Sequence, residues 1–392
     1  MISLADKQKC TGCMACLQTC PVKCISVRED DIGDLYPYID RDTCLECGSC
    51  VKMCPEISTN QEDSFKKANQ AYAVWSLNAN NRSASASGGA AAEFYESALN
   101  QGYWICGVKY EEQYHVRHSL TKDRKEISAF RQSKYVYSEI EEIYGQIKEL
   151  LRKKEKVLFI SLPCKVAGLY SFLGDKLTEN LLTVDIVCHG TPPYAQLKEH
   201  IKKVAILNSE KLIFRKENEF LFEVTDNNKI VYSKIGRQDN YLAAFLDGLN
   251  YRPSCYNCSY ARPERISDIT IGDFWGLGSE IPWNHPYTGS ISAVLINTEK
   301  GRKFWDECRE RFFSEERSVE EAVKGNAQLN HPTPTHPKRA EFEAVYKQKG
   351  FDEAVQICLK DEIKQDRKKH DKVQLRRKLR KIAGIVIPRY RR

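Results

Sequence analysis

The sequence CTGCMACLQTCP occupies residues 10–21, and the same pattern returns as CLECGSCVKMCP at residues 44–55. Each copy has three cysteines separated by two residues, followed three residues later by a Cys-Pro pair. Three thiolates on one tight loop can reach three corners of a cuboidal metal cluster, so the fourth corner needs a ligand from elsewhere. The Cys-Pro of the opposite copy supplies that ligand, and the repeat therefore predicts two four-cysteine sites.

This internal repeat resembles the bacterial two-cluster ferredoxin, which predicts a small α+β domain at the N-terminus. Zinc is the alternative metal, but zinc usually takes its ligands as two separated pairs, which two triplets fit poorly. Gly12 and Gly48 leave room for backbone N–H groups near the cluster sulfurs. Cys24 is expected to be a small packed residue rather than a ninth ligand. The expected ligands are Cys10, Cys13, Cys16 and Cys54 for one [4Fe–4S] cluster, and Cys44, Cys47, Cys50 and Cys20 for the other.

Composition and charge limit the classes of protein to consider. The chain has 392 residues, 16 cysteines and a net charge of +7. We see no apolar signal segment, so many cysteines indicate metal ligation in a reducing cytosol rather than disulfides. The positive charge is concentrated in residues 364–392, which hold 13 Lys and Arg against two Asp. We therefore expect a cytoplasmic protein whose globular part does not bind nucleic acid.

The middle of the chain alternates short β-rich runs with segments of helical period, which predicts an α/β domain. We expect residues 1–60 to form the ferredoxin domain, 71–345 the α/β domain and 346–392 a charged helical tail, with a polar linker at 56–70. The expected strands are 71–77, 103–110, 156–164 and 181–190, and the expected helices are 90–102, 138–155 and 192–204.

Four further cysteines predict a third metal site. Cys164 and Cys188 each end a predicted strand, and ligands gather beyond the carboxyl ends of strands in open α/β sheets. Together with the Cys255/Cys258 pair they provide four thiolates, enough for one [4Fe–4S] cluster or one zinc ion. Cys106, Cys308 and Cys358 lie in apolar or helical contexts and are expected to be structural.

Two other stretches have the composition of anion sites. The run SASASGG (83–89) leads into a predicted helix, whose N-terminus would attract a diphosphate, although a Gly-Gly turn before a helix is usually just a turn. The run RQSKYVYS (131–138) could bind phosphate and stack on an aromatic ring, or form a solvated strand edge.

Several motifs together resemble the β subunit of coenzyme F420 hydrogenase/dehydrogenase, in the form with an N-terminal two-cluster ferredoxin domain. They include SKYVYS (133–138), LPCKVAGL (162–169), VDIVCHGTPP (184–193) and SCYNCSYARPERISDITIGDFWG (254–276). The resemblance implies a flavin-binding α/β domain with FAD and a third [4Fe–4S] cluster on Cys164, Cys188, Cys255 and Cys258. It also implies flavin-site residues, namely Ser87, Gly88, Gly89, Ser133, Lys134, Tyr135, Gly272 and Asp273.

The same resemblance predicts an iron–sulfur and FAD-dependent oxidoreductase. Its expected partners are ferredoxin or another electron-transfer protein and an organic two-electron substrate. An F420H2-oxidising dehydrogenase subunit and a non-catalytic relay subunit are the alternatives. Some relatives resemble proteins of polysaccharide biosynthesis. His189 is a candidate proton relay, with a structural role at the end of the sheet as the alternative.

The C-terminal stretch KVQLRRKLRKIAGIVIP (372–388) combines apolar residues at helical spacing with dense Lys and Arg. Leu375, Leu379, Ile382 and Val386 would lie on one face of a helix on an anionic membrane surface. A solvated or partner-docking tail is the alternative. The predicted location is therefore cytoplasmic, with peripheral contact to the membrane in the first case.

Overall fold

The computed structural model describes residues 2–57, 62–216, 218–285 and 289–382, with the backbone alone for 373–382. Its largest sheet has eight strands in the order β13-β3-β12-β11-β7-β6-β4-β5. The strands at its centre, β11, β7, β6 and β4, are parallel to one another, and the outer ones pair antiparallel. Its strands are β3 (Gln70–Ser76), β4 (Trp104–Tyr110), β5 (Val116–Thr121), β6 (Val157–Ser161), β7 (Leu181–Ile186), β11 (Ile269–Asp273), β12 (Ser292–Ile296) and β13 (Phe312–Arg317).

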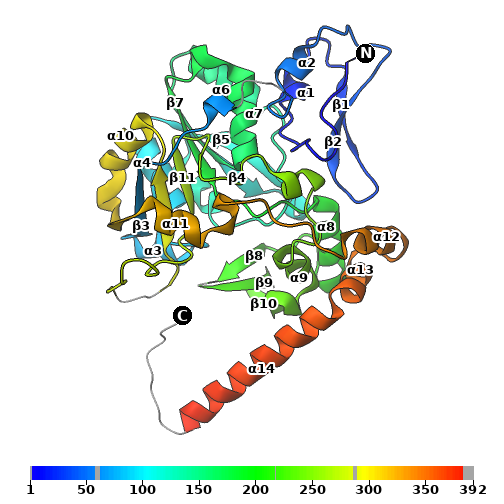
Figure 1. Ribbon diagram of the computed structural model, residues 1–392, viewed down its shortest axis with the longest axis vertical. Coiled ribbons are helices and arrows are strands. Elements are labelled where there is room, and N and C mark those ends of the chain that lie inside the picture. Colours follow the sequence, from blue (N-terminus) through cyan, green and yellow to red (C-terminus); the bar gives the residue numbers. More distant parts are fainter. Residues whose placement is uncertain (1, 58–61, 217, 286–288, 383–392) are drawn as a thin grey trace.

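Helices cover both faces of this sheet (Figure 1). The side chains of β6 are all buried, as expected of a strand with helices on both sides. Leu158 and Ile160 pack toward α4 (Ala90–Asn100) and α10 (Glu299–Cys308), whereas Val157 and Phe159 pack toward α6 (Ile143–Arg152) and α7 (Pro163–Leu173). The alternation in the sequence therefore predicted the mixed α/β architecture correctly.

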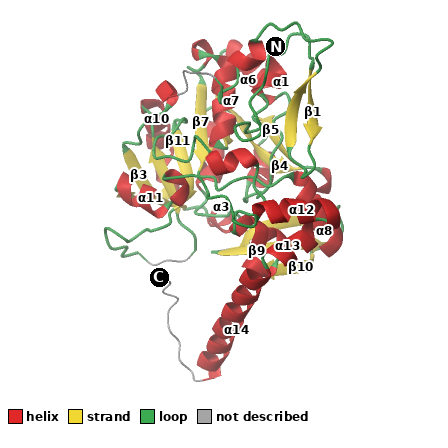
Figure 2. Cartoon of the chain, turned by 45° about the vertical axis from the view of Figure 1, so that its right-hand side comes forward, coloured by secondary structure: helices red, strands yellow, loops and turns green. Residues whose placement is uncertain are grey.

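The N-terminal cysteine repeats belong to a small α+β unit beside α7. It contains α1 (Ala15–Thr19), β1 (Ile25–Glu29), β2 (Leu35–Ile39) and α2 (Ser49–Lys52). The two strands form an antiparallel hairpin that separates the two cysteine loops. Helix α1 packs against α7, so this unit rests directly on the α/β domain (Figure 2).

A second layer that the sequence did not predict lies below the main sheet. It is an antiparallel sheet of β8 (Lys211–Lys216), β9 (Glu219–Asp226) and β10 (Lys229–Ile235). Its core includes residues of α8 (Tyr194–Val204), α9 (Asn240–Leu246) and α13 (Phe351–Cys358). The other helices of the described residues are α3 (Ala79–Ser83), α5 (Ile127–Phe130), α11 (Val319–Gly325), α12 (Arg339–Lys349) and α14 (Lys360–Ile382).

Three predicted element boundaries were wrong. Strand β7 ends at Ile186 rather than at 190, so Cys188 lies in the loop that follows it. Strand β6 ends at Ser161, and Pro163 starts α7, so Cys164 lies in the first turn of a helix rather than at a strand end. Proline is favoured at that position because its missing N–H would be unpaired anyway. Helix α6 begins at Ile143 rather than at 138. The backbone of Glu139 instead pairs with β5, donating to Val116 O and accepting from His118 N.

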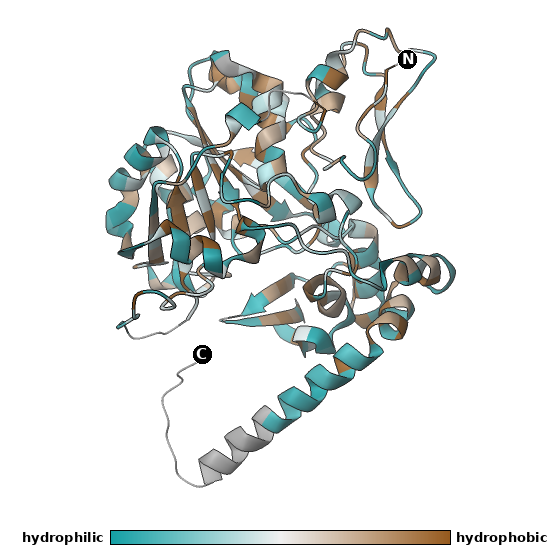
Figure 3. Ribbon diagram, in the orientation of Figure 1, coloured by the Kyte–Doolittle hydropathy of each residue, from teal (hydrophilic) through white to brown (hydrophobic). Residues whose placement is uncertain are grey.

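The C-terminal tail continues as α14, which extends away from the body and is polar where its residues are described (Figure 3). Of the four apolar residues expected on one membrane-facing stripe, Val386 lies outside the described residues, and the side chains of the other three are not described. None of the described helices is long and apolar enough to span a bilayer.

Candidate functional site

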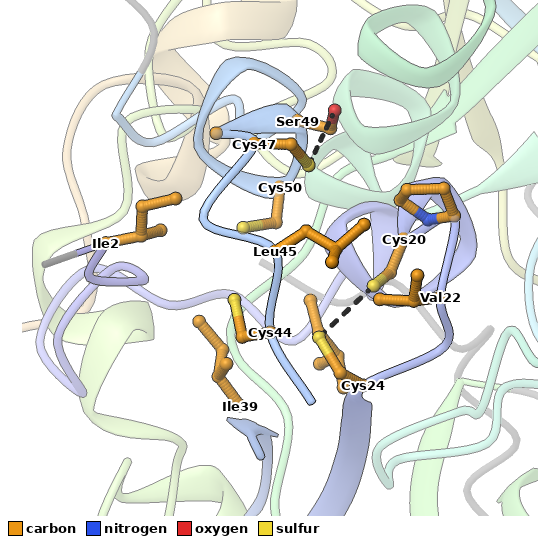
Figure 4. A pocket seen from close by; sticks show the side chains of 13 residues that line it. Ile2, Cys20, Val22, Cys24, Ile39, Cys44, Leu45, Cys47, Ser49 and Cys50 are labelled. Carbon is orange, nitrogen blue, oxygen red and sulfur yellow. Dashed lines mark hydrogen bonds between the residues drawn. The ribbon is translucent and has the colours of Figure 1, made fainter. Parts of the chain in front are cut away.

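Five cysteines line one hollow in the N-terminal unit (Figure 4). Four of them, Cys20, Cys44, Cys47 and Cys50, are the residues predicted to hold one cluster. Cys24 is the fifth, and its Sγ lies 3.4 Å from Cys20 Sγ. Cys24 is thus buried, as expected of a packed residue, but it also belongs to the cysteine hollow, which the repeat alone did not indicate.

The other N-terminal set also lies together. Burial raises the pKa of Cys16, and the charges of Cys13, Cys10 and Cys54 add to this shift. Burial and the charges of Cys13 and Cys10 raise the pKa of Cys54 to about 12. Crowded buried thiols give up their protons only when a cation replaces them, which suits metal ligation.

The backbone of both loops depends on glycine. Gly12 has φ of 67° and Gly48 has φ of 73°, in the left-handed region that favours glycine. Each precedes a short helix that carries a predicted ligand, Cys16 in α1 and Cys50 in α2. Gly12 also needs the space, since a Cβ there would lie 3.1 Å from the Arg252 guanidinium carbon.

The third predicted set lines a single hollow in the α/β domain. Cys164, Cys188, Cys255 and Cys258 surround it, together with Thr11 of the N-terminal unit. The chain therefore brings together four thiols from three segments that are far apart in sequence. Burial raises the pKa of both Cys164 and Cys188, and the neighbouring cysteines raise it further.

One metal ion and a cubane cluster hold their thiolate ligands at different separations. Among the described residues, no three His, Cys, Asp or Glu side chains are arranged to hold one ion. A cubane presents an iron at each of four corners, so it holds its thiolates further apart than one tetrahedral zinc ion does.

The glycine-rich run before α4 differs from the expected diphosphate site. Gly88 is buried and donates its N–H to Ser292 Oγ at 2.9 Å. That hydroxyl in turn donates to Ser87 Oγ at 3.1 Å. Gly89, with φ of 93°, is the N-cap residue of α4. The Gly88 N–H is therefore not free to bind a phosphate, which corrects that part of the expectation.

A buried carboxylate already lies in the first turn of α4. Glu93 accepts hydrogen bonds from Ser76 Oγ at 2.5 Å and Asn81 Nδ2 at 2.7 Å, and pairs with Arg311. Negative charge is stabilised at this end of a helix. The chain itself thus supplies an anion where the sequence suggested a diphosphate.

Lys134 is likewise unavailable to a phosphate. Its ammonium donates to three backbone carbonyls, those of Ala129, Arg131 and Gln132. An ammonium group has only three N–H donors. Burial lowers the pKa of Lys134 to about 7. Lys134 therefore closes its own loop, which corrects its expected role, and the side chain of its neighbour Ser133 bonds to Tyr135.

Tyr135 and Asp273, both predicted flavin-site residues, meet through a residue that sequence reasoning missed. Tyr135 stacks on Phe245 with ring centroids 4.3 Å apart. Arg215 donates to Asp273 at 2.9 Å and lies 3.4 Å from the Tyr135 hydroxyl. Arg215 comes from β8, in the sheet that the sequence did not predict, so no spacing signal pointed to it.

His189 lies beside this group and beside Cys188. Burial lowers the pKa of His189, while the charge of Asp273 raises it and that of Arg215 lowers it further. A Cβ on Gly272 would lie 2.8 Å from the Val187 side chain, so glycine allows β11 to approach the Cys188 segment. The flavin-site candidates Tyr135, Asp273 and Gly272 therefore gather near the third cysteine set, whereas Ser87 and Gly89 lie at α4.

Comparison with known proteins identifies the two parts of the chain. Residues 9–57 and 36–106 match models of the 4Fe-4S dicluster domain. Residues 154–322 match the model of the C terminus of the coenzyme F420 hydrogenase/dehydrogenase beta subunit. The N-terminal unit and the α/β domain are thus similar to these two families, each over part of the chain.

Two known proteins are similar to most of the chain. The F subunit of the F(420)H(2) dehydrogenase of Methanosarcina mazei is 20% identical over 315 residues, which are 77% of this chain and 82% of that protein. A chain of the F420-reducing [NiFe] hydrogenase complex from Methanosarcina barkeri has 17% identity and a TM-score of 0.48, over 76% of this chain and 93% of that one. The matched models make this chain an iron–sulfur protein of oxidoreductase or electron-transfer type.

Proposed function

We propose that the chain is an iron–sulfur flavoprotein oxidoreductase that passes electrons between a partner protein and an organic two-electron substrate. The observation that carries this proposal is the hollow lined by Cys164, Cys188, Cys255 and Cys258 next to the ferredoxin-type unit. Three sets of cysteines that follow one another in space from the surface inward would provide an electron path between two partners.

The chemistry of iron–sulfur clusters and of FAD explains why both are proposed. Iron–sulfur clusters carry single electrons, whereas FAD can also exchange a hydride. The three cysteine sets would hold the clusters, with Cys24 near one of them. For FAD we propose Ser87, Gly89, Tyr135, Gly272 and Asp273 as contacts.

The residues around the third set have separate tasks in this proposal. Arg215 fixes the orientation of the Asp273 carboxylate by an ion pair that is largely buried. His189 could hold a proton near Cys188, since Asp273 and Arg215 are its charged neighbours. At the other end of the path, Cys47 is exposed, so we propose that an external ferredoxin docks at its loop.

Iron analysis of anaerobically purified protein tests whether the third cysteine set holds a cluster. We expect about twelve iron atoms per chain from three cubane clusters, and about eight in Cys258→Ser, which loses one thiolate of the third set. The N-terminal EPR signals should persist in Cys258→Ser. Cys308→Ser, which changes a buried cysteine of the hydrophobic core, is the matched control and should keep all twelve. Eight irons in the unmodified protein would refute the third cluster.

The second candidate function is an F420H2-oxidising dehydrogenase subunit, which the relative from Methanosarcina mazei favours by its name. Stopped-flow mixing with F420H2 distinguishes this second candidate function from the first. Bleaching of flavin and cluster absorbance by F420H2 would favour the dehydrogenase subunit. Flavin that is reduced only through a ferredoxin would favour the first proposal, and protein without flavin would favour a relay subunit.

A further inference from the structure

Two buried cations lie between the N-terminal unit and the third cysteine set. Lys165 follows Cys164 in the first turn of α7, and its residue is 1% exposed. Its ammonium donates to the Gly12 carbonyl at 2.5 Å and to the Tyr137 hydroxyl at 3.1 Å. Gly12 lies between Cys10 and Cys13, so Lys165 joins one cysteine set to the other.

Arg252 makes the same kind of bridge from a different segment. Its residue is also 1% exposed. Its Nε donates to the Cys10 carbonyl at 2.7 Å, and one Nη lies 3.7 Å from Cys10 Sγ. Its own carbonyl accepts the N–H of Cys255 at 2.9 Å. Arg252 therefore contacts a predicted ligand of each set.

Carboxylates compensate little of this positive charge. The strongest charge effects on Lys165 come from Cys164, Cys13, Arg252 and Cys10, and the carboxylate of Glu139 interacts with it as well. Among the described residues, Asp34 is the carboxylate within 4 Å of Arg252, at 3.8 Å, and the Arg252 Nη1 has no hydrogen-bond partner. Buried cations are costly unless they are paired, so an anion is expected beside them. A cluster ligated by four thiolates is such an anion.

The cysteine set around Cys20, Cys44, Cys47 and Cys50 has a different environment. Cys47 is exposed, and the nearby Lys52 is exposed as well. Water and salt screen charges there far more than in the buried contact at Cys10. The two N-terminal sets therefore experience unequal electrostatic fields, although their sequences are nearly the same.

We propose that Lys165 and Arg252 are positioning residues that raise the reduction potential of one N-terminal cluster above that of the other. The inner cluster, whose potential is raised, is held by Cys10, Cys13, Cys16 and Cys54. The outer cluster is held by Cys20, Cys44, Cys47 and Cys50. This rests on the proposed function. A cluster held by the inner cysteines would then accept one electron from a cluster held by the outer cysteines, with no bond made and no proton required. The added negative charge is stabilised by two positive charges at low dielectric. Electrons would thus collect next to Cys164.

EPR-monitored redox titration of the full chain tests this proposal. The signals of the two N-terminal groups are assigned first with Cys16→Ser and Cys47→Ser. In Lys165→Met and in Arg252→Gln, we expect the midpoint potential of the inner group to fall by at least one tenfold step, which is about 59 mV for one electron. The potential of the outer group should not change.

Matched variants distinguish an effect of charge on the midpoint potentials from an effect of altered structure. Lys9→Met removes an exposed cation next to Cys10 in sequence and should leave both potentials unchanged. Lys165→Arg and Arg252→Lys keep the charge and should retain the inner potential. An unchanged potential in the neutral variants would overturn the proposal, as would equal shifts in the charge-conserving variants. Loss of the inner cluster's EPR signal in both neutral variants would also overturn the proposal, because the two cations would then be needed for folding rather than for the potential.

The result is independent of the third cluster. A chain with about eight irons would refute the proposed third group but leave this titration of the N-terminal groups interpretable.

Discussion

Gly88 shows that a glycine in a phosphate-like motif can be required by strand packing instead. A Cβ on this residue would lie 2.3 Å from the Val74 carbonyl oxygen and 2.8 Å from the Ser292 nitrogen. Both atoms belong to backbone, in β3 and β12, so neither can move aside at low cost. The small side chain thus lets α4 start close against the sheet.

Gly88→Ala should therefore destabilise the fold whether or not a flavin is bound. We expect the free energy of unfolding to fall by about 1–3 kcal/mol, the usual cost of overpacking. Denaturant unfolding followed by circular dichroism measures it. Gly145→Ala is the control, because a Cβ on that helical glycine would have no neighbouring atom closer than 4.0 Å and alanine favours helix. Unchanged stability in Gly88→Ala would contradict this prediction.

At the scale of elements, one histidine ties three helices of the second layer together. His200 in α8 lies 2.9 Å from Asp239, the N-cap of α9, and 2.9 Å from Asp352 in α13. Asp239 also accepts the N–H of Leu242 at 2.8 Å. Burial alone would lower the pKa of His200, but the two carboxylates raise it to about 9. The protonated ring therefore pairs with both acids.

This pairing makes the stability of the second layer depend on pH. Since the folded pKa lies above the unfolded value of about 6.5, the stabilisation is fully present below about pH 6.5 and is lost as pH rises through about 9. His200→Gln should lower the free energy of unfolding by about 3–5 kcal/mol at pH 7, because two buried carboxylates lose their cation.

Denaturant unfolding at pH 7 and pH 10 measures this difference, which should shrink at the higher pH. The exposed His331→Gln is the control and should change stability by less than about 0.5 kcal/mol. An equal loss in His200→Gln at both pH values would show that the ring acts by shape rather than by charge.

At the scale of the whole molecule, the ferredoxin-type unit is joined to the α/β domain by a buried polar contact. The Tyr137 hydroxyl donates to the Gly12 carbonyl at 2.6 Å, and Cys13 packs against α7, where a Cβ on Gly168 would lie 3.1 Å from Cys13 Sγ. The unit is therefore packed firmly onto the α/β domain. Among the described residues, helix α14 extends away from this body.

Removing residues 373–392 tests whether that basic segment binds membranes. Each Lys or Arg near an anionic surface contributes about 1 kcal/mol, and salt weakens the attraction. We expect the full chain to co-sediment with phosphatidylserine vesicles at low salt, and the truncated chain to remain in solution. Dye reduction by the truncated protein should be unaffected. Equal sedimentation of both forms would refute membrane binding by the tail.

The sequence by itself determined the features that depend on local spacing. The two C-x2-C-x2-C loops bring their thiols together because neighbouring residues on a tight loop cannot lie far apart. The alternation of β-rich and helical runs predicted four strands of the main sheet, β3, β4, β6 and β7, because burial on both faces requires apolar strands. The other four strands of that sheet were not predicted. The Cys255/Cys258 pair was likewise visible as a separate signal.

Only the tertiary structure decided how distant segments meet. Arg215 reaches Asp273 from a sheet whose strands carried no clear pattern, and Lys165 and Arg252 converge on the Gly12 loop from positions more than 150 residues away. The Gly88 N–H and the Lys134 ammonium were predicted to face a ligand, yet both are taken by the chain's own acceptors. A local pattern shows which groups could bind, but burial and long-range contacts decide which of them remain free to do so.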